Sequence, residues 1–141
     1  MELKQKILDI IKKSGLASFA TITNDGKPWV RYVSMTVSDD MTIRFSTFIN
    51  SRKVAQIKKN PEVHLTCGVV DPEKWQDYLQ IQGAATVSTD KAEKEAFWND
   101  EIAQFFKGPD DPDYAVVIVK SYRIEYWNIE KWQPEIWEAG K

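Results

Sequence analysis

Short β-strand patterns separated by tight turns, rather than by long helices, constrain the fold of this chain most. The first pair, Leu16–Thr23 and Pro28–Val37, is joined at Asn24-Asp25-Gly26, a turn sequence typical of hairpins. Ser38-Asp39-Asp40 then leads into a third strand, Met41–Thr47. Antiparallel strands can be joined by such short turns, whereas parallel strands need a long crossover. The pattern therefore predicts an antiparallel sheet rather than a doubly wound parallel one.

The remaining segments extend the pattern to seven short strands and three helices. Apolar residues at helical spacing from Leu3 to Ile11, followed by Gly15, predict the first helix. Asp90 and Glu93 form a capping box that predicts the start of the last one. The other segments are helices at Ser51–Asn60 and Lys91–Phe106, and strands at Val63–Val70, Asp77–Ser88, Tyr114–Lys120 and Tyr122–Trp127. Since no linker divides the chain, we expect a single, mainly β domain over residues 1–141, an antiparallel sheet closed into a barrel with helices outside.

Composition argues against several classes of function. The net charge is −2 and no block of like charge occurs, so nucleic acid is not an expected partner. One cysteine and one histidine are too few for a zinc site of the usual composition, and no metal is expected. The chain opens with a charged amphipathic segment rather than a signal peptide, and no apolar run reaches membrane-spanning length. We therefore expect a cytoplasmic protein without a membrane partner.

The segment from Ser51 to Lys53 is the strongest functional signal. Ser51 precedes a short helix whose first turn carries two cations, Arg52 and Lys53. That end of a helix already carries partial positive charge from unpaired N–H groups, so cations are unfavourable there. An anion would offset the repulsion, because N–H groups, a hydroxyl and two cations would converge on it. A solvated helix end is the alternative interpretation, and the dipole argument favours a phosphate site.

Arg31 lies in the middle of its strand, between apolar neighbours. Such an arginine either extends along an exposed edge to water or contacts a buried anion. Its strand is one turn away from the strand that ends in Ser46 and Thr47, which leads into the Ser51 helix. Arg31, Ser46 and Thr47 therefore join the helix start as candidates to bind one phosphate and an attached polyol.

No side chain stands out as a catalytic acid, base or nucleophile. His64 is expected to be a strand residue that is either partly exposed or satisfied in its hydrogen bonds. Cys67 has no cationic neighbour in sequence and is expected to be a small core residue. The acidic segment Gly108–Asp113 lacks the ligand spacing of a calcium loop and predicts a rigid turn. Trp127, at the end of a strand, is the tryptophan best placed to stack on a planar ligand, whereas the later tryptophans favour surface packing or a dimer contact.

Several of these segments together resemble the FMN-binding split barrel of the pyridoxamine 5′-phosphate oxidase superfamily. The matching pieces are LASFATITNDGKPWVRYVSM, TIRFSTFINSRKVAQIKKNPEVHLTC and IQGAATV. Within them, the run S-R-K followed by I-x-x-N-P is fairly specific. FWNDEIAQFFKGPDDPDYAVV and RIEYWN resemble the general stress protein branch of the superfamily, so the resemblance covers nearly the whole chain.

The resemblance implies a six- to seven-stranded split barrel that forms a homodimer, with FMN bound between the subunits. The matching strand residues would line the flavin and its ribityl chain, the Ser51 segment would hold the phosphate, and Trp127 would approach from the other subunit. By resemblance, the cofactor-binding residues are Arg31, Tyr32, Val33, Ser34, Met35, Ser46, Thr47, Ser51, Arg52, Lys53 and Trp127.

Two departures separate the chain from the oxidase itself. The oxidase has a lysine five residues after the strand arginine, where this chain has Thr36, and an R-x-H pair after the terminal tryptophan motif, where this chain has NIEKWQPEIWEAGK. Both serve the oxidase's own substrate, so pyridoxamine phosphate oxidase activity is not expected. We expect an FMN-dependent oxidoreductase with an unidentified substrate and electron donor, if the chain is an enzyme. The alternatives are a non-enzymatic flavin-binding stress module, or a split barrel that binds haem or a deazaflavin, of which haem is less attractive with His64 as sole histidine.

Overall fold

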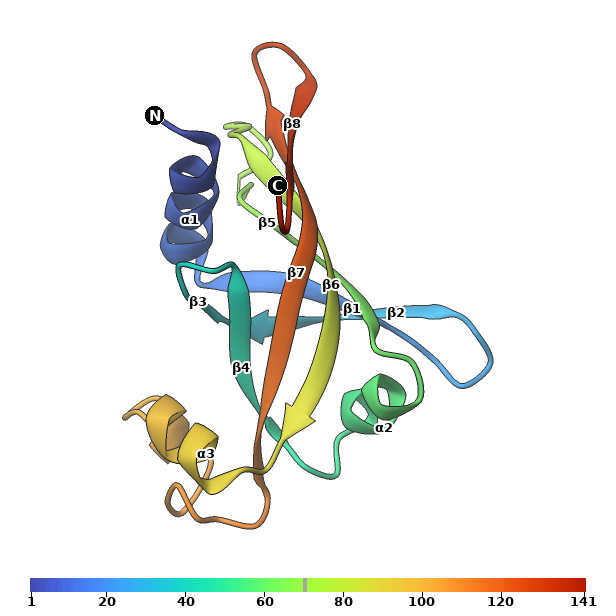
Figure 1. Ribbon diagram of the computed structural model, residues 1–141, viewed down its shortest axis with the longest axis vertical. Helices are drawn as coiled ribbons and strands as arrows, with labels where there is room; N and C mark the ends of the chain where they lie inside the picture. Colours follow the sequence, from blue (N-terminus) through green and yellow to red (C-terminus); the bar gives the residue numbers. More distant parts are fainter. Residues whose placement is uncertain (70) are drawn as a thin grey trace.

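The computed structural model describes residues 1–69 and 71–141 (Figure 1). Within them the chain forms eight β-strands, three α-helices and one 3₁₀ helix. The strands are β1 Leu16–Ile22, β2 Pro28–Ser34, β3 Thr36–Val37, β4 Thr42–Phe48, β5 Glu62–Cys67, β6 Tyr78–Ser88, β7 Tyr114–Asn128 and β8 Gln133–Glu138. The helices are α1 Leu3–Ser14, α2 Arg52–Lys59, α3 Lys91–Phe97 and the 3₁₀ helix η1 Ile102–Gln104. No helix among these residues is long and apolar enough to cross a membrane.

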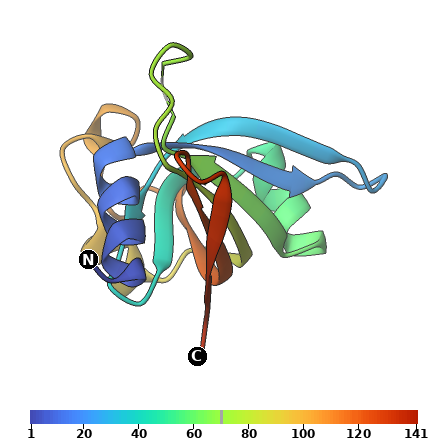
Figure 2. The same ribbon diagram turned by 90° about the horizontal axis from the view of Figure 1, so that it is seen from above.

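All strands belong to one antiparallel sheet that curls into a partly open barrel. Neighbouring strands follow the order β2-β1-β5-β6-β7-β4-β3, and β8 pairs with β7 outside this path. The two ends of the path, β2 and β3, are separated in sequence only by Met35, so one extended segment joins them. Figures 1 and 2 show α1 and α2 well apart along the curled sheet, and both contribute side chains to the same core. This confirms the predicted mainly β, antiparallel split barrel with three flanking helices.

The first hairpin forms as its turn sequence predicts. β1 and β2 pair over their full length in a single register. Gly26 has a φ of 80°, which glycine adopts without steric cost, and the Thr23 N–H donates to the Lys27 carbonyl at 2.8 Å. Since register decides which face of a strand is buried, this turn directs Phe19 and Thr21 of β1 into the barrel, where both are fully buried.

The barrel interior is filled by alternate side chains of the strands. Phe19 and Phe45 are buried there and meet edge to face, with ring centroids 4.8 Å apart. α1 covers one side of this core, and its Ile7 and Ile11 pack into the same cluster. Gly15, with a φ of 66°, ends α1 as predicted and turns the chain into β1.

The last two predicted strands, Tyr114–Lys120 and Tyr122–Trp127, are one strand of 15 residues, β7. The predicted break at Ser121 is wrong, because the pairing of β7 with β6 continues past it with a register shift beside Gly83. Such a β-bulge adds a residue to one strand without ending it. The close approach requires glycine, since a Cβ at Gly83 would lie 2.6 Å from a methyl carbon of Val119.

Two other segments differ from the prediction. The helix predicted over Lys91–Phe106 ends at Phe97, and η1 follows it as a separate turn. Asn99 explains the interruption, since its side-chain oxygen accepts the Ile102 N–H at 3.0 Å and starts the new turn. The sequence also predicts no strand after Trp127, whereas β8 pairs with the outer part of β7.

The other differences concern boundaries. The predicted strand Pro28–Val37 divides at Met35 into β2 and β3, which pair with different neighbours. The predicted strand Val63–Val70 ends at Cys67, and residue 70 lies outside the described part of the chain. The predicted helix Ser51–Asn60 is one residue shorter at each end, where these two residues flank it as N-cap and C-cap.

Replacing Phe45 with alanine is expected to lower the free energy of unfolding by about 3–5 kcal/mol, because a buried ring is removed and a cavity is left beside Phe19. Urea denaturation followed by far-UV circular dichroism measures this change. Phe105→Ala is the control, since Phe105 is 64% exposed and its truncation should change stability by less than about 1 kcal/mol. Equal losses in the two variants would contradict the core position of Phe45.

Candidate functional site

The N-terminus of α2 brings cations together without an acidic partner. The helix begins at Arg52, Ser51 precedes it in an extended conformation, and its first turn contains no acidic residue. In the described part of the chain, neither Arg52 nor Lys53 forms an ion pair with a carboxylate. The cationic helix start that the sequence indicates is therefore present in the fold without an internal counter-charge.

The Ser51 side chain does not cap the helix. It makes no hydrogen bond to the first turn, and its Oγ lies 3.0 Å from Thr47 Oγ1 and 3.4 Å from Lys53 Nζ. Lys53 Nζ also donates to Thr47 Oγ1 at 2.9 Å. Two hydroxyls and an ammonium group thus gather beside first-turn N–H groups that no side chain caps, an arrangement rich in donors that suits an anion.

Arg31 lies close to this cluster and is held by neutral acceptors. Its guanidinium donates to Thr21 Oγ1 at 2.8 Å and to Gln56 Oε1 at 3.2 Å. It also donates to the backbone carbonyls of Phe19 and Trp29. No carboxylate pairs with it among the residues that the structure describes. Because Gln56 belongs to α2, these hydrogen bonds tie β2 to the helix and keep the positive charge between them.

A groove with a volume of about 270 Å³ runs between β2 and the end of β4 and reaches the start of α2. Its lining residues are Arg31, Tyr32, Val33, Ser34, Ser46, Thr47, Phe48, Lys53, Phe105 and Phe106. All of them except the three phenylalanines are residues that the resemblance assigns to the flavin site. The fold therefore brings together two strands and a helix start from separate parts of the chain.

The remaining predicted residues lie outside this lining. Ser51 reaches it only through its hydrogen bonds to lining residues. Arg52 is exposed, and its charge contributes to lowering the pKa of Arg31. Met35 is 5% exposed and lines an adjoining cavity instead. Trp127 is absent from both linings.

Burial and mutual repulsion act on the cations of the groove. Burial lowers the pKa of Lys53, and the nearby charge of Arg31 lowers it further. The pKa of Arg31 is itself lowered, first by burial and then by the charge of Arg52. Both shifts mean that the charged forms are less favourable here than in water, so a bound anion would relieve them.

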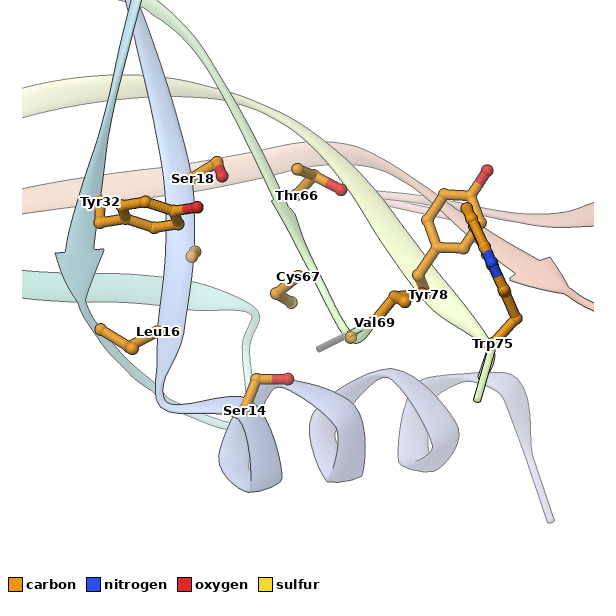
Figure 3. Close-up of a pocket in the computed structure, with 11 residues that line it drawn as sticks. Ser14, Leu16, Ser18, Tyr32, Thr66, Cys67, Val69, Trp75 and Tyr78 are labelled. Atoms are coloured by element: carbon orange, nitrogen blue, oxygen red, sulfur yellow. The ribbon is translucent and has the colours of Figure 1, made fainter. Parts of the chain in front are cut away.

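Trp127 lies at the opposite end of β7 from the groove. Its ring stacks on Tyr78, with centroids 6.2 Å apart and an interplanar angle of 6°, and its Nε1 donates to Glu125 at 3.1 Å. Tyr78 and Trp75 line a separate cavity of about 690 Å³ between α1, β1 and β5 (Figure 3). Within one protomer, the fold therefore does not bring Trp127 to the groove.

Three residues of the groove are not predicted from the sequence. Phe48, Phe105 and Phe106 form its apolar wall, and the centroids of Phe48 and Phe106 lie 4.7 Å apart. Their sequence signal is weak, because phenylalanines near the end of a strand or a helix are typical of a core. Phe105 and Phe106 follow η1, the separate turn that the sequence does not predict.

His64 and the acidic loop have structural surroundings. His64 is half-buried on β5 and lines another cavity together with Glu125. Burial lowers its pKa, and the charge of Glu125 opposes that shift. In the loop, Asp111 accepts the N–H groups of Lys107 and Asp113, both at 2.9 Å, so the segment forms the turn that its sequence predicts.

Comparison with known proteins supports the resemblance. The family model described as Pyridoxamine 5′-phosphate oxidase matches residues 3–128. General stress protein 26 of Bacillus subtilis (strain 168) is 30% identical over 128 residues, which cover 90% of this chain and 89% of that protein. The crystal structure of General Stress Protein 26 from Bacillus anthracis str. Sterne has a TM-score of 0.82 and 28% identity, and the match covers 98% of this chain and 99% of that one.

A more distant solved structure shares the fold alone. The heme binding protein from Mycobacterium smegmatis has a TM-score of 0.79 and 14% identity, and the match covers 99% of this chain and 59% of that one. The same barrel is thus found in a protein whose name indicates a different ligand, so the fold by itself does not determine what the groove binds.

Cys67 is expected to resist thiol reagents in the folded protein, because burial raises the pKa of its thiol to about 11. Labelling with Ellman's reagent at about pH 8, close to the ordinary thiol pKa, should be slow until urea unfolds the protein. It should then reach one thiol per chain. A short cysteine peptide in the same buffer provides the rate of an exposed thiol, and equally rapid labelling of the native protein would contradict the core position.

Proposed function

The chain belongs to the pyridoxamine 5′-phosphate oxidase family, and from this premise we propose that it is a cytoplasmic FMN-binding flavoprotein with a redox function. The observation that carries the proposal is the group of cations at one end of the groove, Arg31, Arg52 and Lys53, which have no acidic partner within the described chain. The proposal covers residues 1–141 as a single domain.

The start of α2 fits the phosphate of FMN. Lys53 and the hydroxyls of Ser51 and Thr47 are already within hydrogen-bond distance of one another. These groups and the uncapped first-turn N–H groups of α2 are donors that a phosphate accepts. Arg52 adds charge at the same helix end. A phosphate here would offset the repulsion that lowers the pKa values of Lys53 and Arg31.

The rest of the groove suits the ribityl chain and the flavin ring. β2 pairs with β1 on one side only, so along residues 32–34 some peptide groups on its other side are open to a ligand. Phe48, Phe105 and Phe106 supply apolar surface that excludes water. When bound, FMN supplies hydride and electron transfer, whereas the protein binds and orients the cofactor.

We propose that the protein acts as a homodimer with FMN at the subunit interface. Trp29, Val30 and Tyr32 of β2 are 51%, 60% and 79% exposed. Val30 and Tyr32 share one face of the strand and Trp29 lies on the other, and exposed apolar side chains of this kind are typical of an interface. Because Trp127 lies at the far end of β7 from the groove of its own protomer, the tryptophan of a second copy would complete the site.

The proposed substrate differs from that of the oxidase. Thr36 takes the place of the oxidase lysine, and the segment after Trp127, which the structure describes in full, contains neither arginine nor histidine. Its residues 133–138 form β8 along β7. We therefore propose a substrate other than that of the oxidase, and the electron donor is not identified by these residues. Reduction of the bound flavin by NADH or NADPH, with turnover on reoxidation, distinguishes an enzyme from a passive flavin-binding module.

Haem and a deazaflavin are the alternative cofactors to FMN. His64 is the only histidine of the chain and lines a different cavity, so it offers no axial ligand in the groove. A phosphate-bearing deazaflavin would satisfy the same cations as FMN. Identification of the chromophore released from purified protein separates these cofactors.

Lys53→Ala is expected to weaken FMN binding by about 10- to 100-fold, because it removes a charge-assisted contact worth about 1.5–3 kcal/mol. Quenching of flavin fluorescence during titration measures the dissociation constant. Lys58→Ala is the matched control, since Lys58 lies in the last turn of the same helix and does not line the groove. An unchanged affinity in Lys53→Ala would contradict the phosphate site.

Mixing two defective variants tests whether the site is shared between protomers. Lys53→Ala and Trp127→Ala homodimers should each bind FMN weakly. Subunit exchange should produce mixed dimers with one unaltered site and one site that carries both substitutions, so tight FMN binding should return at one site per mixed dimer. If native mass spectrometry shows complete exchange and tight binding does not return, the shared site is refuted.

A further inference from the structure

A second cavity continues the proposed cofactor groove away from Lys53. Its volume is about 400 Å³, and it shares Ser34, Ser46 and Phe105 with the groove. Its other walls come from β3 and from the segment between the end of α3 and η1. We call it the distal cavity. A ligand that fills the groove is therefore in direct reach of a molecule in the distal cavity.

The groove and the distal cavity carry opposite charges. Arg31 and Lys53 line the groove. The described lining of the distal cavity contains no lysine, arginine or histidine and has one carboxylate, that of Glu101. Glu101 forms no ion pair within the described chain. The other polar groups of the cavity are hydroxyls and the amides of Asn99 and Gln104.

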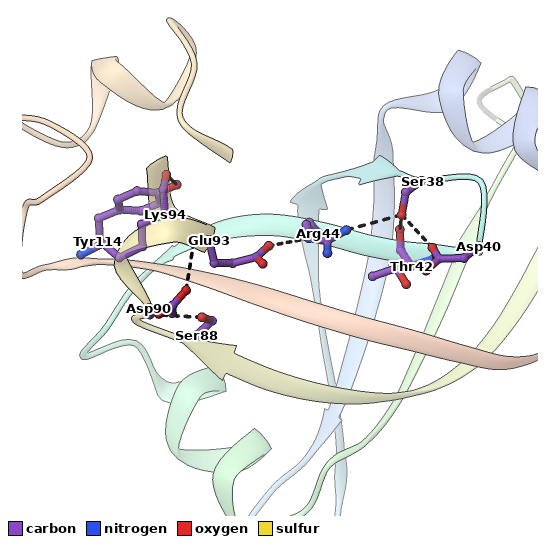
Figure 4. A network of polar contacts seen from close by, with 9 residues as sticks. All are labelled: Ser38, Asp40, Thr42, Arg44, Ser88, Asp90, Glu93, Lys94 and Tyr114. Carbon is purple, nitrogen blue, oxygen red and sulfur yellow. Dashed lines mark hydrogen bonds and ion pairs between the residues drawn. The ribbon is translucent and has the colours of Figure 1, made fainter. Parts of the chain in front are cut away.

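Arg44 is a cation that the fold places next to the distal cavity, and it is already neutralised. The β3–β4 register sets it opposite Thr36, which lines the cavity. Its Nε donates to Glu93 at 2.6 Å and its Nη1 to Ser38 Oγ at 3.4 Å (Figure 4). The two side chains of this ion pair are only 28% and 26% exposed. Arg44 is therefore not free to bind an anion in the cavity.

We infer that the distal cavity receives the second substrate of the flavoprotein, and that this substrate is an uncharged or amine-bearing planar molecule rather than a phosphorylated one. This substrate class rests on the proposed function, because the residues shared by the two cavities contact a substrate and FMN together only if FMN occupies the groove. A phosphate would lie beside Glu101 without a compensating cation from the same protomer, which is unfavourable. An ammonium group would pair with Glu101, and the rings of Phe97 and Phe105 offer apolar surface to a planar molecule.

Pyridoxamine and pyridoxamine 5′-phosphate form a matched pair of probes, because they differ only in the phosphate. Equilibrium dialysis against FMN-loaded protein should show that pyridoxamine binds more tightly by about two- to fivefold, the scale of one exposed charge contact. Glu101→Lys should reverse this order, and it is expected to fold because Glu101 is exposed. Asp100→Lys makes the same charge change outside the cavity lining and should keep the order. Equal or tighter binding of the phosphate by the unaltered protein, or an unchanged order in Glu101→Lys, would overturn the inference.

The FMN affinity of the same samples separates this substrate class from the proposed function. If FMN binds tightly and the two probes bind equally, only the assignment of the distal cavity is wrong. If FMN does not bind, the dialysis is repeated in saturating inorganic phosphate, which occupies the cations of the groove and keeps the phosphorylated probe from them. A preference for pyridoxamine then supports the charge assigned to the distal cavity, whereas the missing FMN binding refutes the proposed cofactor.

Discussion

The barrel depends on one extended segment, residues 28–37, which pairs first with β1 and then with β4. These two strands do not pair with each other within the described chain. The first part of the segment is β2 and its last part is β3. No ladder joins β2 to β4 in the described sheet, so the barrel is split between them. The groove lies along this split, with β2 on one side and the end of β4 on the other. The segment that closes the sheet thus leaves a strip of backbone open beside it.

The positive charges of Arg31, Arg52 and Lys53 lie close together at this split, which is unfavourable without a bound anion. Arg31 is held by neutral acceptors and Lys53 by hydroxyls, so these hydrogen bonds fix the side chains without cancelling their charge. Elsewhere on β4 the chain does the opposite, since Glu93 neutralises Arg44 directly. The contrast distinguishes a cation that stabilises the fold from cations that remain available to a ligand. It also explains why the groove and the distal cavity differ in charge although they share part of their lining.

Short-range signals predict the parts of the fold that depend on them. The Asn24-Asp25-Gly26 turn, the stop at Gly15 and the Asp90 cap each act within a few residues, and each is present. The continuity of β7 is not predictable in this way, because the sequence around the polar Ser121 is compatible with either a bulge or the end of a strand. The strand continues past Ser121 because it pairs with β6 on both sides of the bulge. In the site, the cations are predictable from their conflict with the helix dipole, whereas the position of Phe105 depends on how an interrupted helix packs.

β7 places the two halves of the proposed site at opposite ends of one strand. Ala115 pairs with Thr47 beside the groove, and Trp127 pairs with Tyr78 at the other end. These ends are about 40 Å apart along an extended strand, so a protomer cannot supply its own tryptophan. In the proposed homodimer, cofactor binding and subunit association are therefore thermodynamically linked, and each stabilises the other by mass action. Dilution would favour release of both together, and a rise in free FMN would shift the equilibrium towards the dimer at a given protein concentration.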